Sequence, residues 1–264
     1  MLKFAWLLIA AITLYGGPVA ADADAGPDAG AGAKHKVRLM ANTSPPYADK
    51  KLAGEGLALE LVRHIFARTD YVPEITIENW SRAVEGARLG DYDGLAAAWY
   101  SEARNQDLEF SEPYLDSKLI ILKLRSSPGN YHSLQDLSGA RLGVRADYAY
   151  GVDFTAIPNL TLVEENHLIQ LLLKLQDGSV DFVIGDRRTI IMELNAYMKD
   201  NLNQFTVLDI PLPDVQRHVA ASRDLAGHEA LIEAFNRALA ETLKDGSLQA
   251  IISKWDGSLG DFSQ

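Results

Sequence analysis

The chain has 264 residues, of which 47% are hydrophobic and 23% charged, and these fractions are ordinary for a folded globular protein. Its 25 basic and 36 acidic residues give a formal charge of −11, which argues against nucleic acid as a partner, because binding to phosphate backbones depends on basic patches. The absence of cysteine excludes disulfides, thiol catalysis, iron–sulfur clusters and cysteine-ligated zinc.

The first residues have the pattern of a secretory signal peptide. Lys3 precedes an apolar run of about 12 residues, which is too short to cross roughly 30 Å of hydrocarbon as a helix. Small residues follow at 19–21, where a signal peptidase would cut. We predict a signal peptide over residues 1–21; cleavage after Ala23 and a buried N-terminal helix are the alternatives.

Residues 22–35 are predicted to be a flexible leader. Up to residue 33 they are only Ala, Asp, Gly and Pro, which bury too little apolar area to offset the entropy of ordering. No cysteine follows the apolar run, so a lipid anchor of the bacterial lipoprotein kind is excluded. The mature protein is therefore expected to be released and soluble.

The rest of the first half alternates predicted strands and helices. Apolar residues at helical spacing predict a helix over 57–68, and Gly90 ends a second helix over 80–89. Strands are predicted at 37–41, 75–77, 92–99 and 118–124.

The alternation then restarts at residue 141. Such alternation implies parallel α/β sheets, and two cycles imply two similar lobes. We predict lobe 1 over 36–122 and 213–264, lobe 2 over 123–212, and a hinge of two crossings near 121–124 and 208–213. Strands are predicted at 141–145, 160–164, 180–185, 205–210 and 218–222, and helices at 148–154, 168–175, 187–199, 228–243 and 248–255.

Motifs for cofactors, metals and nucleophilic catalysis are missing. The sequence contains no dinucleotide fingerprint, phosphate loop, H-E-x-x-H or carboxylate metal loop, and no G-x-S-x-G elbow. Its six histidines never come together at metal-ligand spacing. We therefore expect no cofactor, no metal site and no catalytic residues.

Two charged residues follow predicted strands at their carboxyl ends, where open α/β sheets bind ligands. Arg104 comes one short turn after the strand 92–99, and Asp186 directly follows the strand 180–185. An arginine fork and a carboxylate on opposite walls would suit a zwitterion. Two alternatives remain open: Arg104 pairs on the surface with Glu102, Asp107 or Glu109, or Asp186 caps the following helix.

An ordered set of motifs resembles extracytoplasmic solute-binding proteins of family 3, the branch that serves polar amino-acid ABC importers. The resemblance covers about residues 36–257. It implies an α/β, two-lobed periplasmic binding protein (type II) fold, each lobe a mostly parallel sheet flanked by helices, that closes on its ligand by hinge motion. The motifs are GLALEL at 56–61, Trp80, GDYDG at 90–94, SEAR at 101–104, FSEPY at 110–114, DLSG at 136–139, LGV at 142–144, GSVD at 178–181, Asp186, DG at 245–246 and KW at 254–255.

The resemblance also implies roles for single residues. Arg104 matches the arginine that grips the ligand's α-carboxylate, and Asp186 matches the acid that takes its α-ammonium. Trp80 falls where the family places an aromatic against the ligand side chain, although a core anchor at the start of a helix is its structural alternative. Tyr47 lies in the neighbouring Pro-rich loop.

Two departures from the family bear on the ligand. Trp99 stands where amino-acid binders usually carry a small hydroxyl residue, and the stretch with Tyr148, Ala149 and Tyr150 replaces a Gly-Ser/Thr turn. A helix N-terminus still binds an anion without hydroxyls. The aromatic residues predict a small, tightly enclosed ligand or one that is not a standard α-amino acid, such as a methylated amine held by cation–π contacts.

The main hypothesis is a monomeric periplasmic protein, not an enzyme, that captures a small polar, amino-acid-like ligand or related amine by cleft closure and delivers it to the membrane permease of an ABC importer. One rival is a lyase of the cyclohexadienyl dehydratase kind on the same scaffold, with Glu102 or Asp147 as general acid. Another is a ligand-sensing accessory protein. A sensor domain fused to a kinase is not expected.

Overall fold

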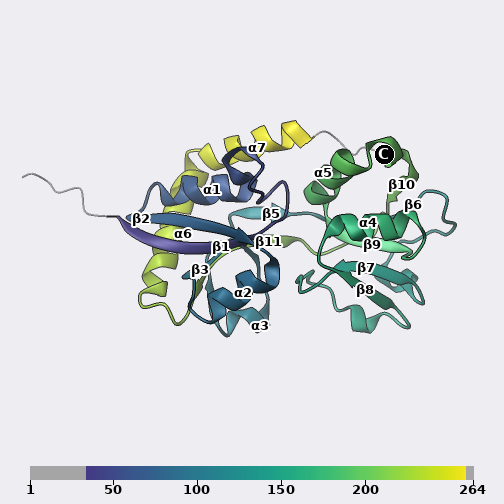
Figure 1. Ribbon diagram of the computed structural model, residues 1–264, viewed down its shortest axis with the longest axis horizontal. Coiled ribbons are helices and arrows are strands. Elements are labelled where there is room, and N and C mark those ends of the chain that lie inside the picture. The colour runs from purple at the N-terminus through teal and green to yellow at the C-terminus, as the bar shows by residue number, and fades with distance from the viewer. Residues whose placement is uncertain (1–33, 260–264) are drawn as a thin grey trace, which may run out of the picture. The chain divides into compact units, whose positions relative to one another are not determined.

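The computed structural model describes residues 34–259, which contain two mixed β-sheets flanked by helices (Figure 1). The predicted signal peptide and nearly all of the predicted leader lie outside the described residues. All described residues belong to one compact unit. Among them no helix is both long enough and apolar enough to cross a membrane.

The first sheet has the strand order β2-β1-β3-β11-β4, and β5 also pairs with β11. Strand β1 runs parallel to β2 and β3, whereas β11 runs antiparallel to β3, β4 and β5. The strands are β1 (His35–Asn42), β2 (Tyr71–Glu78), β3 (Gly94–Trp99), β4 (Leu108–Phe110), β5 (Leu115–Ser117) and β11 (Val215–Ser222).

Side chains that alternate along the strands of this sheet point to opposite faces, and the two faces pack into different hydrophobic cores. Leu39 and Val219 belong to the larger core, which includes buried residues of α1 (Leu57–Phe66), α6 (His228–Lys244) and α7 (Ser247–Leu259), whereas Met40 and Ala220 pack with α2 (Trp80–Arg88) on the other side. Gly94 is required in β3, because a Cβ there would lie 2.1 Å from the Ala220 carbonyl oxygen.

The second sheet has the order β10-β6-β9-β7-β8. Its strands are β6 (Leu119–Leu124), β7 (Arg141–Arg145), β8 (Thr161–Glu165), β9 (Phe182–Asp186) and β10 (Phe205–Val207). Helices α4 (Leu168–Gln176) and α5 (Arg187–Tyr197) cover one face (Figure 1), and an aromatic-rich core lies on the other. Four short 3-10 segments lie at Ala53–Glu55, Leu134–Leu137, Phe154–Ala156 and Lys199–Gln204.

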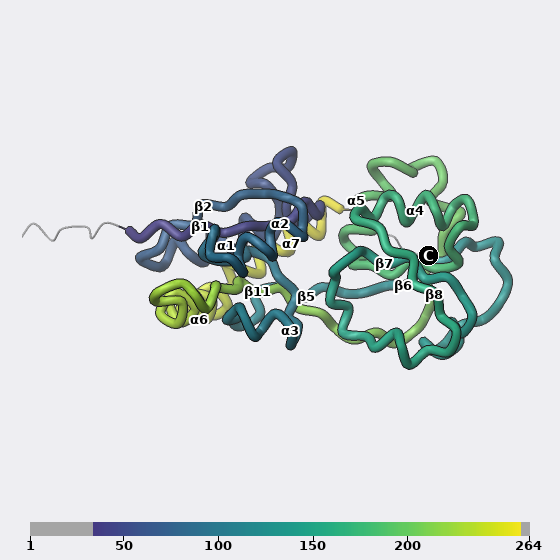
Figure 2. Tube along the Cα trace, turned by 60° about the horizontal axis from the view of Figure 1, so that its bottom comes forward, coloured from purple at the N-terminus to yellow at the C-terminus, as the bar shows by residue number. Residues whose placement is uncertain are grey.

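The two sheets define the two lobes, and the chain passes between them twice: at Lys118, between β5 and β6, and over residues 208–214, between β10 and β11 (Figure 2). The predicted first crossing at 121–124 lies inside β6, which pairs with β9 and β10. A boundary at residue 122 would cut this strand, so the sheet boundary falls before Leu119. The rest of the predicted lobe division stays a prediction.

Two other expectations need correction. The sheets are mixed rather than mostly parallel, because β11 and β6 each run antiparallel to their neighbours. The predicted helix over 148–154 is a loop that ends in a 3-10 turn. The left-handed backbone at Asp147 and Gly151, with φ values of 59° and 66°, does not permit a continuous α-helix there.

Candidate functional site

A small cavity with a volume of about 10 Å³ opens at the carboxyl ends of β1 and β3. This volume holds about one water molecule and is far below the usual range of about 300–1,000 Å³ for ligand pockets, so the surrounding side chains must move to admit a ligand. Both lobes contribute to it. Its lining residues are Asn42, Trp80, Ala97, Trp99, Arg104, Tyr148, Ala149 and Arg217.

Arg104 is held in this cavity by a short helix and by both lobes. It lies in α3 (Glu102–Asn105), which Ser101 caps by accepting the Arg104 backbone N–H. Its guanidinium donates to the carbonyl of Trp99 at 3.0 Å and to that of Asp147, and lies 4.8 Å from the ring centre of Trp80. Desolvation by burial lowers its pKa, and the guanidinium stays charged at neutral pH.

The surface alternative for Arg104 fails. Within residues 34–259, neither Glu102 nor Asp107 pairs with it, and Glu109 instead contacts His228 and Arg223. Arg104 is therefore a cavity residue with carbonyl partners, and carbonyls leave its positive charge available to an anion.

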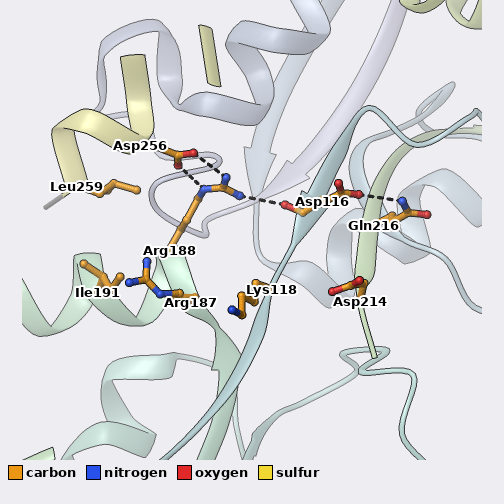
Figure 3. A pocket seen from close by; sticks show the side chains of 9 residues that line it. All are labelled: Asp116, Lys118, Arg187, Arg188, Ile191, Asp214, Gln216, Asp256 and Leu259. Atoms are coloured by element: carbon orange, nitrogen blue, oxygen red, sulfur yellow. Dashed lines mark hydrogen bonds and ion pairs between the residues drawn. The ribbon is translucent and has the colours of Figure 1, made fainter. Parts of the chain in front are cut away.

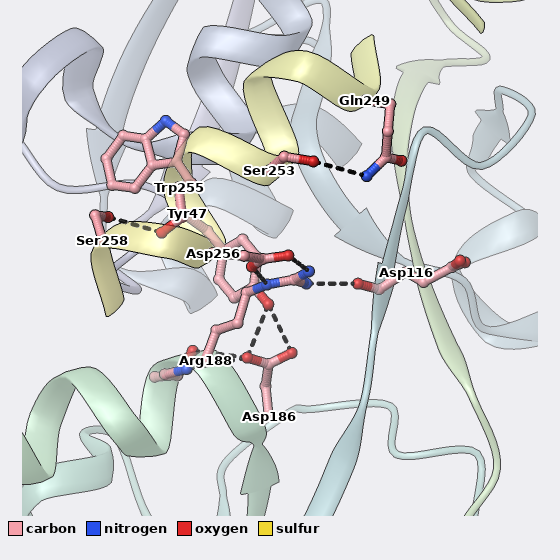
Figure 4. Close-up of polar contacts among 10 residues, drawn as sticks. Tyr47, Asp116, Asp186, Arg188, Gln249, Ser253, Trp255, Asp256 and Ser258 are labelled. Atoms are coloured by element: carbon pink, nitrogen blue, oxygen red, sulfur yellow. Dashed lines mark hydrogen bonds and ion pairs between the residues drawn. The ribbon is translucent and has the colours of Figure 1, made fainter. Parts of the chain in front are cut away.

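Asp186 and Tyr47 form a buried contact between the lobes (Figure 4). The Tyr47 hydroxyl lies 2.8 Å from both carboxylate oxygens of Asp186, and the two residues are 0% and 5% exposed. Asp186 also caps α5 by accepting the Thr189 N–H at 3.0 Å, as the capping alternative predicted. Burial, followed by the charge of Asp186, raises the pKa of Tyr47, so its hydroxyl stays protonated and donates.

A backbone constraint places Tyr47 at this contact. Gly56 has φ 110°, and a Cβ at Gly56 would lie 2.6 Å from the Tyr47 carbonyl. The backbone N–H groups of Leu57 and Ala58 donate to the carbonyls of Pro46 and Tyr47. The first turn of α1 thus fixes the Pro-rich loop close to its own start.

Aromatic rings of the two lobes pack together beside Arg104. Trp99 makes edge contacts with Tyr148 and Tyr150 at centroid distances of 5.1 and 5.8 Å. Asn42 donates to the Tyr148 hydroxyl at 2.6 Å, and the Trp80 indole N–H donates to the Asp147 carbonyl at 3.1 Å. Trp80, the first residue of α2, therefore faces the other lobe rather than only anchoring a core.

Five of the eight predicted site residues line the cavity, and their roles stay predictions. These five are Trp80, Trp99, Arg104, Tyr148 and Ala149. Tyr47, Asp186 and Tyr150 lie outside its lining: the first two bond to each other, and the Tyr150 hydroxyl accepts the Arg145 backbone N–H at 2.9 Å.

Sequence reasoning missed Arg217, a second arginine in the cavity lining. It lies within β11, opposite Trp99 in the register, and is 3% exposed. The available signal was an arginine beside an otherwise apolar run, but the predicted strand began one residue later. Strand alternation could not have placed the side chain of Arg217, because the register of β11 shifts between His218 and Ala220 and residues on both faces are buried there.

A second, more open hollow lies where α5 meets the end of α7 (Figure 3). There Arg188 makes a two-pronged ion pair with Asp256, with distances of 2.6 and 3.0 Å, and donates to the Asp116 carbonyl at 3.0 Å. Desolvation by burial lowers the pKa of Arg188, but its bonds to Asp256 and Tyr47 raise the pKa by more, so the net change is upward. This pair joins the lobes without contributing to the Arg104 cavity.

Within residues 34–259, no group of three or more His, Cys, Asp or Glu side chains is arranged to hold a metal ion. The Arg104 cavity, with its basic and aromatic lining between two lobes, is the candidate small-molecule site.

The chain belongs to the bacterial extracellular solute-binding proteins, family 3, whose family model matches residues 37–258. It is 29% identical over 229 residues to the L-cystine-binding protein TcyJ of Escherichia coli (strain K12), covering 83% of this chain and 81% of that protein. It is 23% identical to a probable histidine-binding protein of Campylobacter jejuni, covering 83% and 85%.

A third relative is much longer. The chain is 27% identical over 188 residues to the virulence sensor protein BvgS of Bordetella bronchiseptica; the match covers 71% of this chain but only 15% of the sensor. The chain thus corresponds to a small part of that protein.

Solved structures share the fold. An ancestral arginine-binding protein bound to arginine superposes with a TM-score of 0.70 at 23% identity, covering 84% of this chain and 99% of that one. A histidine kinase sensor domain with similarity to periplasmic binding proteins gives a TM-score of 0.70 at 22% identity, covering 84% and 96%. These likenesses confirm the two-lobed α/β fold.

Proposed function

We propose that the protein captures a small, amino-acid-like carboxylate in the Arg104 cavity, by closing its two lobes, and delivers it to the permease of an ABC importer. The observation that carries this proposal is Arg104 itself, a partly buried guanidinium whose partners are neutral carbonyls. A ligand carboxylate accepts two parallel N–H bonds from such a fork.

Each lobe supplies a different part of the proposed binding site. Lobe 1 supplies Arg104, Trp80 and Trp99, and lobe 2 supplies the loop with Asp147 and Tyr148. A ligand on Arg104 would replace its bond to the Asp147 carbonyl and bridge the lobes. Closure is then favoured because the ligand gains contacts in the closed state that the open state lacks.

We assign Asp186 to closure rather than to the predicted ligand ammonium. Its oxygens already accept bonds from Tyr47 and Thr189, and it does not line the cavity. The Tyr47 hydroxyl thus stands where the family resemblance places an ammonium group. The ligand is bound chiefly through its carboxylate and its apolar body.

Binding rather than catalysis suits the cavity. Neither predicted general acid lines it: Glu102 accepts a bond from Tyr100 at 2.7 Å, and the Asp147 carboxylate accepts one from Ser81 at 3.3 Å. Membership of the extracellular family supports export by the predicted signal peptide and a periplasmic location. We propose that the protein acts there as a monomer.

A sensory role is the second candidate, and the match to the virulence sensor supports it. In that case the liganded lobes dock on a receptor instead of a permease. The chemistry of capture is the same in both roles.

Isothermal titration calorimetry with a panel of amino acids, amines and small carboxylates tests the proposal. At least one carboxylate is expected to bind, and Arg104→Ala is expected to lose that binding. Arg237→Ala is the control, because Arg237 is an exposed residue of α6 paired with Glu233. Unchanged affinity in Arg104→Ala contradicts the site.

A further inference from the structure

Arg217 is a buried cation without a counter-ion. Within residues 34–259, its guanidinium makes no hydrogen bond or ion pair, and its Nε is buried without an acceptor. Its side chain stacks on the Tyr47 ring, with 3.5 Å from Cζ to the ring centre, and lies 5.4 Å from the Trp99 ring centre. The nearby Asp186 does not pair with it, since the carboxylate bonds to Tyr47 and Thr189.

A second donor in the same cavity lacks an acceptor. The Trp99 indole Nε1 is buried without a partner among the described residues, and Trp99 and Arg217 both line the cavity. Leaving buried donors unsatisfied is costly, and leaving a buried charge unpaired costs more. A negatively charged group that enters the cavity would supply acceptors for the Trp99 indole N–H and a counter-charge for Arg217, and so remove both penalties.

We propose that Arg217 is a second anion-binding residue, so that the ligand is a small molecule with two carboxylates, one on Arg104 and one on Arg217. This inference rests on the proposed function and names the ligand class of the same site. The charge of the lining supports it: Arg104 and Arg217 are its charged members, and no carboxylate lies among them.

The rest of the lining suits the body of such a ligand. Trp80 and Trp99 offer apolar faces, and Asn42 offers an amide that now bonds to Tyr148. A basic side chain on the ligand would meet two guanidinium groups in a water-poor space, where like charges repel strongly. The cavity therefore selects against cationic amino acids.

The test compares ligands of matched shape by calorimetry: L-glutamate, L-glutamine, glutarate and L-arginine. L-glutamate and glutarate share two carboxylates, and L-glutamine differs from L-glutamate in charge at one end. We expect L-glutamate or glutarate to bind at least about tenfold more tightly than L-glutamine, which corresponds to about 1.4 kcal/mol. Glutarate lacks the α-ammonium group of L-glutamate, so tighter binding of glutarate would show that the protein has no favourable site for a ligand ammonium.

Arg217→Gln keeps a side chain of similar length without the charge, and it is expected to reduce the preference for L-glutamate over L-glutamine to about threefold or less. Thermal melting checks that it folds, and Arg217→Lys, which restores a charge, is expected to recover part of the preference. A merely structural role for Arg217 would lower stability without changing this ratio.

Two outcomes overturn the inference while leaving the proposed function intact: wild type binds L-glutamine or L-arginine as tightly as L-glutamate, or the ratio is unchanged in Arg217→Gln. Failure of the proposed function looks different, because then no carboxylate of the wider panel binds, or Arg104→Ala binds as wild type does.

Discussion

Replacing Tyr47 by phenylalanine removes the hydroxyl that joins the lobes at Asp186 and leaves the ring under Arg217. The bond is buried, and its acceptor is a carboxylate; hydrogen bonds to charged groups contribute about 1.5–3 kcal/mol. Because Asp186 keeps its bonds to Thr189 in the variant, the expected loss of stability in the closed form is at the lower end of this range. A loss of about 1.5 kcal/mol lowers the ratio of closed to open molecules about tenfold.

Ligand affinity should fall with that ratio, because the closed form is the one that binds tightly, and the loss reaches about tenfold if the open form predominates without ligand. Calorimetry with the ligand found in the panel measures the affinity, and spin labels on the two lobes measure the distance between them. Tyr114→Phe is the matched control, since the buried Tyr114 hydroxyl donates to the Ala96 carbonyl within lobe 1.

The opposite result would refute this reasoning. If Tyr47→Phe binds the ligand more tightly than wild type, then the tyrosine hydroxyl competes with a ligand ammonium for Asp186. In that case the family's zwitterion site is intact, and Asp186 belongs to the ligand-binding residues.

Gly56→Ala should destabilise the protein by about 1–3 kcal/mol and weaken ligand binding, because a Cβ would lie 2.6 Å from the Tyr47 backbone at a φ of 110°; chemical denaturation and calorimetry measure both effects. Burial lowers the pKa of His218 below its ordinary 6.5, so stability is greatest above pH 6.5 and falls as the unfolded chain takes up a proton at lower pH. Melting curves between pH 7 and 5 should therefore depend less on pH in His218→Gln than in wild type, and equal slopes would contradict this. Asp256→Asn should lower unfolding free energy by about 1 kcal/mol or less, since the side chains of Arg188 and Asp256 are 20% and 46% exposed; a loss of several kcal/mol in denaturant titration would show a stronger link.

The places of Arg104 and Asp186 in the structure follow from local sequence, while their roles in binding stay predictions. Arg104 lies just beyond the end of a small-residue strand, where parallel sheets place ligands, and it does line the cavity. Asp186 lies between a strand and a helix, and it does cap that helix. Strand, turn and helix signals in neighbouring residues were sufficient to place both residues, but not to assign their roles.

Contacts between distant residues could not be predicted in this way. Tyr47 and Asp186 are 139 positions apart, and nothing local marks a tyrosine as the partner of that carboxylate. The buried position of Arg217 depends on its pairing in β11 opposite Trp99. The 148–154 loop was mistaken for a helix because most of its residues permit one, whereas the left-handed backbone at Gly151 does not.

The Arg188–Asp256 pair is one of several contacts that join the lobes in addition to the two stretches of chain that connect them. Two connecting stretches alone would let the lobes rotate about them, but with the ion pair present either this pair must break or the lobes must bend before they can open. Rising ionic strength screens exposed ion pairs more than buried contacts. Rising salt should thus weaken the Arg188–Asp256 pair more than the buried Tyr47–Asp186 bond beside it.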